Sequence, residues 1–397
     1  MSKNKSEQTK GKKNQTSGGK QNRWTALLLQ ICYGTLLAVN ILSAILMMIS
    51  AYGGYFEVED YPVISVSALA FPLLFVITFI LWTVWLVWRK WRTAIIMILP
   101  FLICIQQIYA FFPLGGIIPK KESGREGNKF TLLTYNIMQW EDFKQRELPY
   151  NPTMSAVIKM DADIVALQEC YSFEMNKSGG NILPTQLDSL YKKYPYRVVS
   201  TRDLALLSKY PIVSTSNISA DSYSYAAAKY EIELPCGDIV TLFNVHLQSI
   251  GLSDDDKAEY QSVVSKQIIE EKVDSIKGTL KYLRHFVYPK LAAANVSRAA
   301  QARIINAIVK KEAGRVVLCG DFNDIPYSFS YRKIKGRMKD LYTERGFGPA
   351  ITFHANKLYF RIDQVLYKGN LVPLDISKKS YPCSDHYPLI AKFETNN

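Results

Sequence analysis

The sequence predicts a mixed α/β domain preceded by three membrane-spanning helices, and two observations lead to this fold class. The first is a set of three long uncharged stretches before residue 120. The second is a series of short β-rich runs in the rest of the chain, with helical patterns between several of them. An apolar share of 48% in 397 residues excludes a disordered or fibrous protein.

The three uncharged stretches contain 33, 28 and 27 residues, and a membrane-spanning helix needs about 20 apolar residues. The predicted spans are Trp24–Ala51, Tyr61–Trp88 and Thr93–Leu114. A cleaved signal peptide is a weaker interpretation of the first span, because the apolar run Leu27–Ile49 exceeds the usual length of roughly 7–15 residues. Helices buried in a soluble α-domain are weaker still, since no polar side marks a solvent face. A simple soluble enzyme is excluded.

Basic residues set the expected orientation of the spans. Six lysines and Arg23 precede the first span, the first loop carries only the acids Glu57, Glu59 and Asp60, and the second loop is the basic run 89–92. This alternation predicts a multi-pass protein of the cell membrane. Its N-terminus would be cytoplasmic, and everything after the third span would be extracytoplasmic.

The predicted organisation has four parts. Residues 1–22 form a disordered basic cytoplasmic tail, 23–118 a three-helix membrane anchor, 119–128 a linker and 129–397 the mixed α/β domain. Apolar residues spaced three or four apart predict an amphipathic helix from Asp255 to Val287, within a helical insertion near 253–296. That helix either packs on the domain, lies on the membrane or controls the access of a substrate. The predicted strands are Phe130–Asn136, Ile164–Gln168, Arg197–Ser200, Leu204–Leu207, Ile239–Val245, Val316–Cys319 and Ile362–Leu366.

The net charge of +13 divides into +6 for residues 1–118 and +7 for residues 119–397. The first excess faces anionic lipid. The second is compatible with a phosphate-bearing substrate but does not by itself indicate nucleic acid. The six cysteines form no C-x-x-C pair, so a zinc site is not indicated.

Polar side chains gather at the ends of the predicted strands. One strand ends in the amide of Asn136, the next is followed by Glu169, and a third ends in His246. The remaining members of the set are Asp321, Asn323, Asp363, Asp385 and His386. A single residue of this kind is most often a cap or a turn former.

As a set, these four carboxylates, two amides and two imidazoles fit metal-assisted phosphoryl chemistry. One or two carboxylates hold magnesium, and another orients or deprotonates water. Amide and imidazolium donors stabilise charge on phosphoryl oxygens. Nothing in the set requires zinc, flavin or nicotinamide, and the chain has no P-loop motif.

Six short motifs resemble the endonuclease/exonuclease/phosphatase superfamily, and they occur in the family's order between Lys129 and Phe393. The motifs are Thr134-Tyr135-Asn136, Leu167-Gln168-Glu169, Asn244-Val245-His246, Gly320-Asp321-Phe322-Asn323, Arg361-Ile362-Asp363 and Ser384-Asp385-His386. The family includes deoxyribonucleases, abasic-site endonucleases, inositol polyphosphate phosphatases and neutral sphingomyelinases. The resemblance implies a four-layer α/β/β/α sandwich with its site at one edge.

The resemblance also implies a role for each residue. Glu169 is the main ligand of Mg2+, with Mn2+ as the alternative, Asn136 is its neighbour and Asp385 is a second carboxylate on the metal side. Asp321 aligns or activates water, and Asn323 contacts the phosphate. In the same comparison His386 contacts the scissile phosphate, Asp363 orients a histidine and His246 protonates the leaving oxygen. Some nucleases pair the first histidine with an additional acid; Arg202 and Asp203 lie nearby, and neither is assigned.

The leading hypothesis is therefore a membrane-anchored, Mg2+-dependent hydrolase of phosphate esters that acts outside the cytoplasm. Its partners would be the lipid bilayer, through three spans, and a phosphate-ester substrate such as a phospholipid. A membrane-tethered nuclease that degrades DNA or RNA is the less favoured alternative. A binding or scaffold protein that has lost activity is disfavoured because the motifs are complete, and a transporter because the spans contain no ionisable acid, base or histidine.

Overall fold

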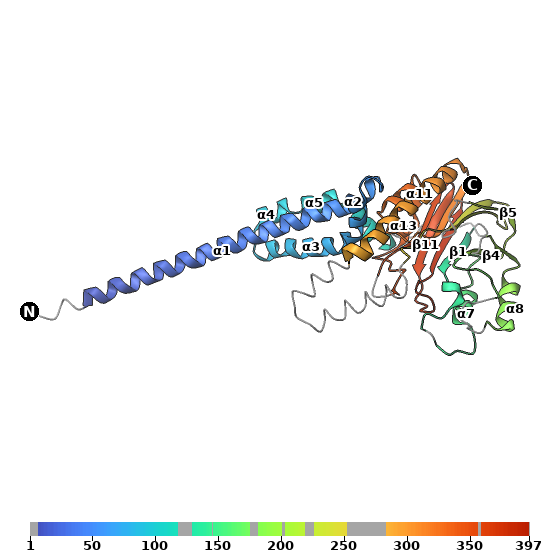
Figure 1. Cartoon of the computed structure of the whole chain (residues 1–397), viewed down its shortest axis with the longest axis horizontal. Helices are drawn as coiled ribbons and strands as arrows, with labels where there is room; N and C mark the ends of the chain where they lie inside the picture. The colour runs from blue at the N-terminus through green and yellow to red at the C-terminus, as the bar shows by residue number, and fades with distance from the viewer. Residues whose placement is uncertain are drawn as a thin grey trace, which may run out of the picture. The chain divides into compact units, whose positions relative to one another are not determined.

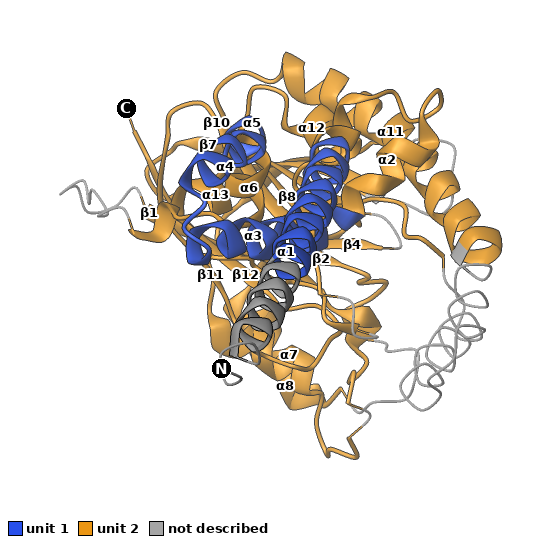
Figure 2. Ribbon diagram, turned by 90° about the vertical axis from the view of Figure 1, so that its left-hand side faces the viewer, with its two compact units in different colours: residues 1–50, 70–105 blue, residues 51–69, 106–397 orange. Residues whose placement is uncertain are grey.

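The computed structural model describes residues 7–117, 129–144, 146–174, 182–200, 203–218, 226–251, 283–355 and 359–396. The chain divides into two compact units, which Figure 2 shows in different colours. The first unit comprises Met1–Ser50 and Ala70–Ile105, and the second comprises Ala51–Leu69 and Gln106–Asn397. The second unit therefore includes two segments, 51–69 and 106–117, that the sequence assigns to the anchor.

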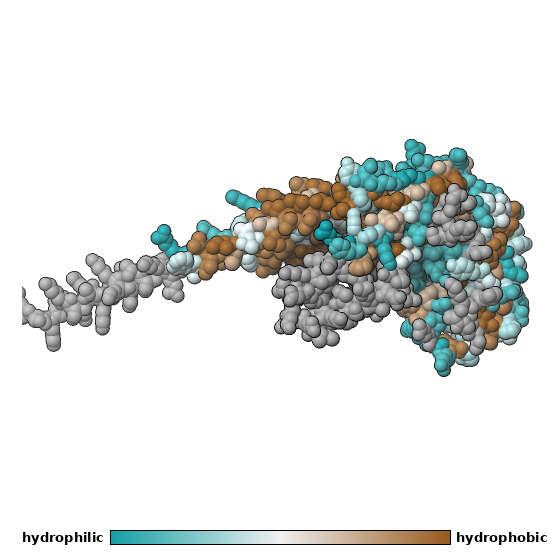
Figure 3. Space-filling view, viewed as in Figure 1, coloured by the Kyte–Doolittle hydropathy of each residue, from teal (hydrophilic) through white to brown (hydrophobic). Residues whose placement is uncertain are grey.

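The first unit consists of apolar helices (Figure 1). Within the described part of the chain, two helices, Arg23–Tyr55 and Pro62–Val87, are long and apolar enough to cross a membrane. Their side chains leave large apolar surfaces uncovered, with Leu28 57% and Leu73 64% exposed, and brown apolar surface covers these helices in Figure 3. Such an area is typical of contact with lipid rather than water. Residues 7–111 contain the helices α1 (Glu7–Tyr52), α2 (Pro62–Ser67), α3 (Phe71–Val87), α4 (Trp91–Ile96), α5 (Leu99–Ile103) and α6 (Ile105–Phe111), with 3-10 turns η1 (Gly53–Tyr55) and η2 (Ala68–Ala70). Of these elements, η1, α2 and most of α6 belong to the second unit.

The third predicted span, Thr93–Leu114, is not one straight helix. Trp91–Ile103 and Ile105–Phe111 form a pair bent by 68°, so three spans result only if this pair counts as one. Pro100 contributes to the interruption between α4 and α5, because proline lacks an N–H and clashes with the carbonyl four residues earlier. At the other end of the region, the helical assignment of α1 extends into the tail predicted to be disordered.

The second unit contains two six-stranded sheets (Figure 1). The first has the order β11-β12-β1-β2-β4-β3 and the second β5-β6-β7-β8-β10-β9. The strands of the first sheet are β1 (Lys129–Asn136), β2 (Ile164–Gln168), β3 (Tyr196–Val199), β4 (Leu204–Ser208), β11 (Leu371–Lys378) and β12 (Leu389–Thr395). Those of the second are β5 (Ile212–Asn217), β6 (Ala226–Glu233), β7 (Ile239–His246), β8 (Arg315–Asp321), β9 (Lys339–Asp340) and β10 (Asp363–Lys368).

The sheets pack face to face and helices cover their outer faces, which confirms the four-layer sandwich. Leu132 and Leu206 of the first sheet share a buried cluster with Leu242 and Val317 of the second. Helices α7 (Pro152–Met160) and α8 (Pro184–Lys193) pack on the first sheet. Helices α11 (Tyr288–Lys311) and α12 (Phe329–Lys335) pack on the second. The remaining helical segments are η3 (Gly115–Ile117), η4 (Met138–Trp140), the π-helical turn η5 (Leu283–Val287) and α13 (Leu341–Arg345).

The seven predicted strands match β1, β2, β3, β4, β7, β8 and β10 to within two residues at either end. Four longer strands were not predicted from the sequence, and these are β5, β6, β11 and β12. Residues 119–128 of the predicted linker and 253–282 of the predicted insertion lie outside the described residues. The last part of the insertion is the beginning of α11, which continues without a break to Lys311.

Candidate active site

The site forms where strands of both sheets end at the same edge of the sandwich. Asn136 ends β1 and lies beside Gln168 of the parallel strand β2. His246 ends β7 beside Asp321, the last residue of the parallel strand β8. On the other side of β8, Asp363 at the start of β10 also pairs with Asp321. Because parallel strands end at a common edge, this register brings together residues that are far apart in the sequence.

Asn136 links the two sheets at this edge. Its Nδ2 donates to Glu169 Oε1 at 3.1 Å and to Asp321 Oδ2 at 3.1 Å. Its Oδ1 accepts from the Met138 backbone N–H at 3.1 Å. Asn136 is 1% exposed, so the amide has a single fixed orientation between two carboxylates.

Asp321 lies at the centre of the site. Its Oδ2 is 3.7 Å from His246 Nε2 and 3.6 Å from His386 Nε2. Burial raises the pKa of Asp321 above its ordinary value of 3.8, although the charges of the two histidines oppose this shift. A buried carboxylate that faces two imidazoles is suited to hold a proton-bearing group such as water.

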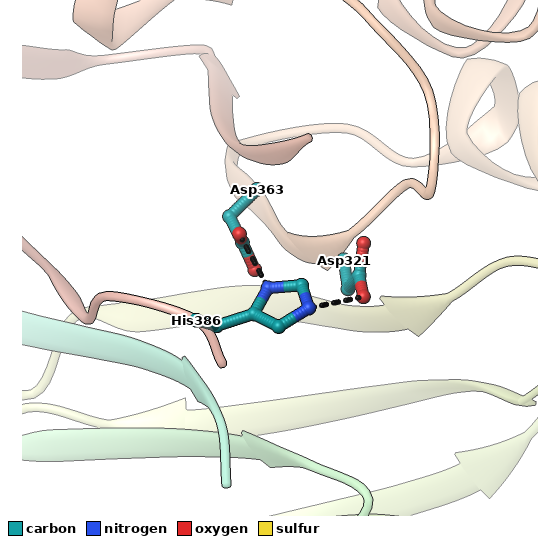
Figure 4. Close-up of side chains that lie close together, drawn as sticks. All are labelled: Asp321, Asp363 and His386. Atoms are coloured by element: carbon teal, nitrogen blue, oxygen red, sulfur yellow. Dashed lines mark hydrogen bonds and ion pairs between the residues drawn. The ribbon is translucent and has the colours of Figure 1, made fainter. Parts of the chain in front are cut away.

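Each imidazole is held at its other nitrogen by an acid. His386 Nδ1 donates to Asp363 Oδ2 at 2.9 Å, and Figure 4 shows the ring between Asp363 and Asp321. His246 Nδ1 makes the corresponding contact with Asp203 Oδ2. In both cases Nε2 is left to face Asp321, so the acids fix the ring orientation.

The acids also keep both histidines protonated. Burial by itself lowers the pKa of His246, but the charge of Asp203 and its hydrogen bond, with Asp321 and Glu169, outweigh burial and raise the pKa to about 10. For His386 the same balance holds with Asp363 and Asp321, and its pKa lies well above 6.5. Both rings are therefore cationic near neutral pH and can donate a hydrogen bond or a proton from Nε2.

Glu169 is positioned by unusual backbone. Its φ is +54°, and Met138, Gln139 and Trp140 in the facing turn also have positive φ. The Gln139 N–H donates to the Glu169 carbonyl at 3.1 Å, which joins the two strained segments. Each such residue costs on the order of 1 kcal/mol, and strain of this kind is found where the surrounding structure fixes a functional group.

Asn323 and Asp385 lie beside these groups. Asn323 has φ +49°, donates its backbone N–H to Asp321 Oδ1 at 2.7 Å and donates Nδ2 to the Leu247 carbonyl at 2.9 Å. Asp385 is half-buried, and its charge raises the pKa of Glu169, although burial of Glu169 is the larger cause. Ser384 connects this corner to β1, since its Oγ donates to the Asn136 carbonyl at 2.8 Å.

Two groups of side chains are candidates for a metal. Among the described residues, Asp321, Asp363 and His386 have ligand atoms within 4.8 Å of one another. In that group His386 could offer only a nitrogen ligand, and its Nδ1 is already hydrogen-bonded to Asp363. Glu169 and Asp385 offer carboxylate oxygens instead, and oxygen donors are what magnesium prefers. Asn136, which the sequence assigned to the same metal, turns its Nδ2 rather than its oxygen toward Glu169. The donor chemistry of the Glu169 corner therefore fits magnesium better.

The structure brings together all eight residues singled out in the sequence. Six of them, Asn136, Glu169, His246, Asp321, Asp363 and His386, are joined by the contacts above, and Asn323 and Asp385 lie next to them. The sequence analysis left Asp203 unassigned. The family resemblance pointed to an acid in this stretch that pairs with the first histidine, but no motif distinguished Asp203 from its neighbours, and its contact with His246 assigns it here.

The fold and the edge site define a hydrolase of phosphate esters. A model of the "Endonuclease/Exonuclease/phosphatase family" matches residues 144–386, more than half of the chain. The chain belongs to the endonuclease/exonuclease/phosphatase family. A second model, described only as a domain of unknown function, matches residues 33–111. No curated protein sequence is significantly similar to the chain.

Solved structures with low sequence identity resemble about two thirds of the chain. An endonuclease/exonuclease/phosphatase from Beutenbergia cavernae is 14% identical, and the match covers 68% of this chain and 72% of that one with a TM-score of 0.46. One from Bacteroides vulgatus is 18% identical, with 68% and 99% covered and a TM-score of 0.42. The human Nocturnin catalytic domain is 14% identical, with 68% and 96% covered and a TM-score of 0.44.

Proposed function

We propose that this protein is a membrane-anchored, magnesium-dependent phosphodiesterase or phosphatase that acts outside the cytoplasm. The observation that carries the proposal is the arrangement around Asp321, whose Oδ2 faces the Nε2 atoms of two acid-held histidines. This arrangement places a proton acceptor between two proton or hydrogen-bond donors, which is what water attack on a phosphate ester requires.

In this mechanism Asp321 orients a water molecule and accepts its proton as the water oxygen bonds to phosphorus. His386 and Asn323 donate hydrogen bonds to the non-bridging oxygens, and Asp363 holds the His386 ring in place. As the bond from phosphorus to the leaving oxygen breaks, His246 donates its Nε2 proton to that oxygen. Magnesium held by Glu169 and Asp385, with Asn136 holding the Glu169 carboxylate, would offset negative charge on the phosphate.

The membrane part of the proposal rests on the apolar helices and the charges between them. The two long apolar helices and the bent pair supply up to three spans. The basic residues before the first helix and in the run 89–92 favour the cytoplasmic side for those segments. The catalytic domain and the acidic loop that contains Glu57 and Glu59 would then lie on the opposite side.

Anchoring favours a substrate that is itself held at the bilayer, such as a phospholipid. The direct test uses the full chain reconstituted in vesicles with millimolar Mg2+. The substrates are sphingomyelin and glycerophospholipids in the same vesicles, inositol phosphates, plasmid DNA and RNA. Turnover of a phospholipid supports the proposal, and cleavage of nucleic acid alone would favour the tethered nuclease.

The controls separate chemistry from folding. Glu169→Gln and Asp321→Asn keep the size of each side chain and remove its charge. Each variant should lose turnover by orders of magnitude while the thermal unfolding of the domain changes little. If either variant keeps a near-native rate, the assigned roles are wrong.

A further inference from the structure

The segment Ala51–Leu69, which includes the end of α1, the acidic loop and helix α2 and is called here the juxtamembrane loop, packs on the catalytic sandwich. Val58 is 1% exposed and forms a buried cluster with Ala299 of α11 and Phe329 of α12. At Gly54 the backbones approach so closely that a Cβ atom would lie 2.1 Å from the Tyr327 carbonyl oxygen. The loop therefore belongs to the packed body of the second unit.

Ion pairs hold the same loop from its outer side. Arg303 of α11 donates to Glu57 at 2.6 Å and to Glu59 at 2.7 Å and 3.0 Å. The acids that distinguish this loop in the sequence thus contact the catalytic unit.

A chain of buried polar side chains runs inward from the loop. Ser65 Oγ accepts from Asn295 Nδ2 at 3.2 Å, and Asn295 Oδ1 accepts from Nη2 of Arg298. Ser65 is 7%, Asn295 8% and Arg298 2% exposed, so water contributes little to this chain. A buried guanidinium keeps its position only where its surroundings supply acceptors.

Arg298 reaches both loops that carry catalytic groups. Its Nη1 donates to the Gln248 carbonyl at 3.0 Å, two residues after His246. Its Nε lies 3.5 Å from Asp324 Oδ2, one residue after Asn323 and three after Asp321. Gln301, one turn further along α11, accepts from the Gln248 N–H at 3.0 Å. Helix α11 thus holds both segments that directly follow β7 and β8.

A second segment beside the apolar helices makes a comparable contact. Arg361, 7% exposed, donates from Nη2 to the Ala110 carbonyl at 3.0 Å and lies 3.2 Å from Asp340. Arg361 is two residues before Asp363, the acid that holds His386. Ala110 therefore contacts a residue that is close in sequence to the site, as Ser65 does through Asn295 and Arg298.

We propose that Arg298 is a positioning residue and that the juxtamembrane loop, through Ser65 and Asn295, is part of what positions the active site. The loop holds Asn295, Asn295 holds Arg298, and Arg298 holds the backbone beyond His246 and the carboxylate beside Asn323. The membrane region is then more than a tether, because its connecting loop completes the catalytic unit. This inference goes beyond the proposed hydrolase activity and names residues that do not touch the reacting atoms.

The test uses the full chain in detergent micelles, with Mg2+ and bis(4-nitrophenyl) phosphate as the probe. The variants are Ser65→Ala, Asn295→Ala, their double variant, and Arg298→Met with the conservative Arg298→Lys. The matched control is Ser67→Ala, because Ser67 lies in the same helix α2 but donates to the Ile64 carbonyl of its own helix. Hydrogen exchange of the peptides that cover 246–251 and 322–328 provides a second readout that needs no turnover.

A positioning role predicts a loss in kcat of about tenfold for Ser65→Ala and Asn295→Ala, with KM changed by less than about twofold. The double variant should lose no more than the worse single variant, since both act through Arg298. Arg298→Lys should recover part of the loss seen in Arg298→Met. Exchange should rise in the two loop peptides and stay unchanged in the peptide that covers β1.

The inference is overturned if Ser65→Ala and Asn295→Ala behave like Ser67→Ala in both readouts. It is also overturned if the loop peptides exchange faster while kcat is unchanged. If the wild-type chain does not turn over the probe, the proposed function is in doubt. The exchange comparison still decides this inference, because unchanged loop peptides would then reject it.

Discussion

Asp203 accepts a hydrogen bond from Nδ1 of His246, although 43 residues separate the two. Asp203 directly precedes β4 of the first sheet, and His246 ends β7 of the second, so the contact crosses the sandwich. The opposite nitrogen of His246 faces Asp321. His386 has the same arrangement with Asp363, so Asp321 lies between two histidines that are each held by an acid.

This contact makes the pH profile of turnover diagnostic. The pKa of His246 is raised to about 10, so the ring keeps its proton below that pH and loses it above. If His246 protonates the leaving oxygen, kcat falls as the pH rises through about 10. Asp203→Asn removes the largest cause that raises this pKa, and the fall should then move toward the ordinary value of 6.5. An alkaline limb that stays at the same pH in Asp203→Asn would show that His246 is not the acid.

Removal of the Glu169 charge should weaken metal binding as well as catalysis. Glu169→Gln should lose at least about 100-fold in kcat and should require a higher Mg2+ concentration for half-maximal rate. Binding of Mn2+, followed by electron paramagnetic resonance, measures the same loss without turnover. Glu147→Gln is the matched control, because Glu147 is exposed. Equal Mn2+ affinity in Glu169→Gln and Glu147→Gln would place the metal elsewhere.

Gly320 supplies a prediction about stability. Its φ is +134°, and a Cβ atom there would lie 1.9 Å from the Val245 carbonyl oxygen of the adjacent strand. Gly320→Ala should therefore destabilise the sandwich by about 3 kcal/mol, from strained backbone and overpacking together. Gly237 has φ +83° with nothing within 4 Å, so Gly237→Ala should cost only about 1 kcal/mol. Thermal unfolding monitored by near-UV circular dichroism compares the two, and equal melting temperatures would contradict the close approach.

The ion pair between Glu59 and Arg303 should stabilise the chain only in part of the pH range. The hydrogen bond from Arg303 lowers the pKa of Glu59 from 4.5 to about 2. A lowered folded-state pKa means that this stabilisation is complete above pH 4.5 and is lost as the pH falls toward 2. Both side chains are more than a third exposed, so Arg303→Gln should cost no more than about 1 kcal/mol at pH 7. The melting temperatures of the wild type and Arg303→Gln should differ less at pH 3 than at pH 7. An equal difference at the two pH values would contradict the stabilising role of this ion pair.

The sequence was most informative where a buried strand ends in a polar group. Asn136, His246 and Asp321 follow apolar runs, and their side chains meet because β1 and β2, and β7 and β8, run parallel. The apolar helices were equally clear, since an uncharged, largely apolar stretch of more than about 20 residues is typical of a membrane span. These features depend on local composition, which a single sequence displays.

Features that depend on the packing of distant segments were not predictable. Strand β5 is largely exposed and β6 includes Lys229 and Glu231, so neither forms the apolar run by which a strand was recognised. Asp203 and Arg298 carry no motif, and their roles follow from contacts across the fold. The boundary of the catalytic unit also differs from the predicted one. The sequence assigns Ala51–Leu69 to the membrane anchor, whereas in the structure this segment packs with the sandwich.

Attack of water on phosphorus is the central claim, and the fate of oxygen from isotopically labelled water tests it most directly. The full chain, with Mg2+ and bis(4-nitrophenyl) phosphate, is incubated in water enriched in oxygen-18, and both products are analysed by mass spectrometry. Attack on phosphorus puts one labelled oxygen into the 4-nitrophenyl phosphate and leaves the 4-nitrophenol unlabelled, and Asp321→Asn should show no turnover. Label in the 4-nitrophenol, or equal turnover by wild type and Asp321→Asn, would contradict it.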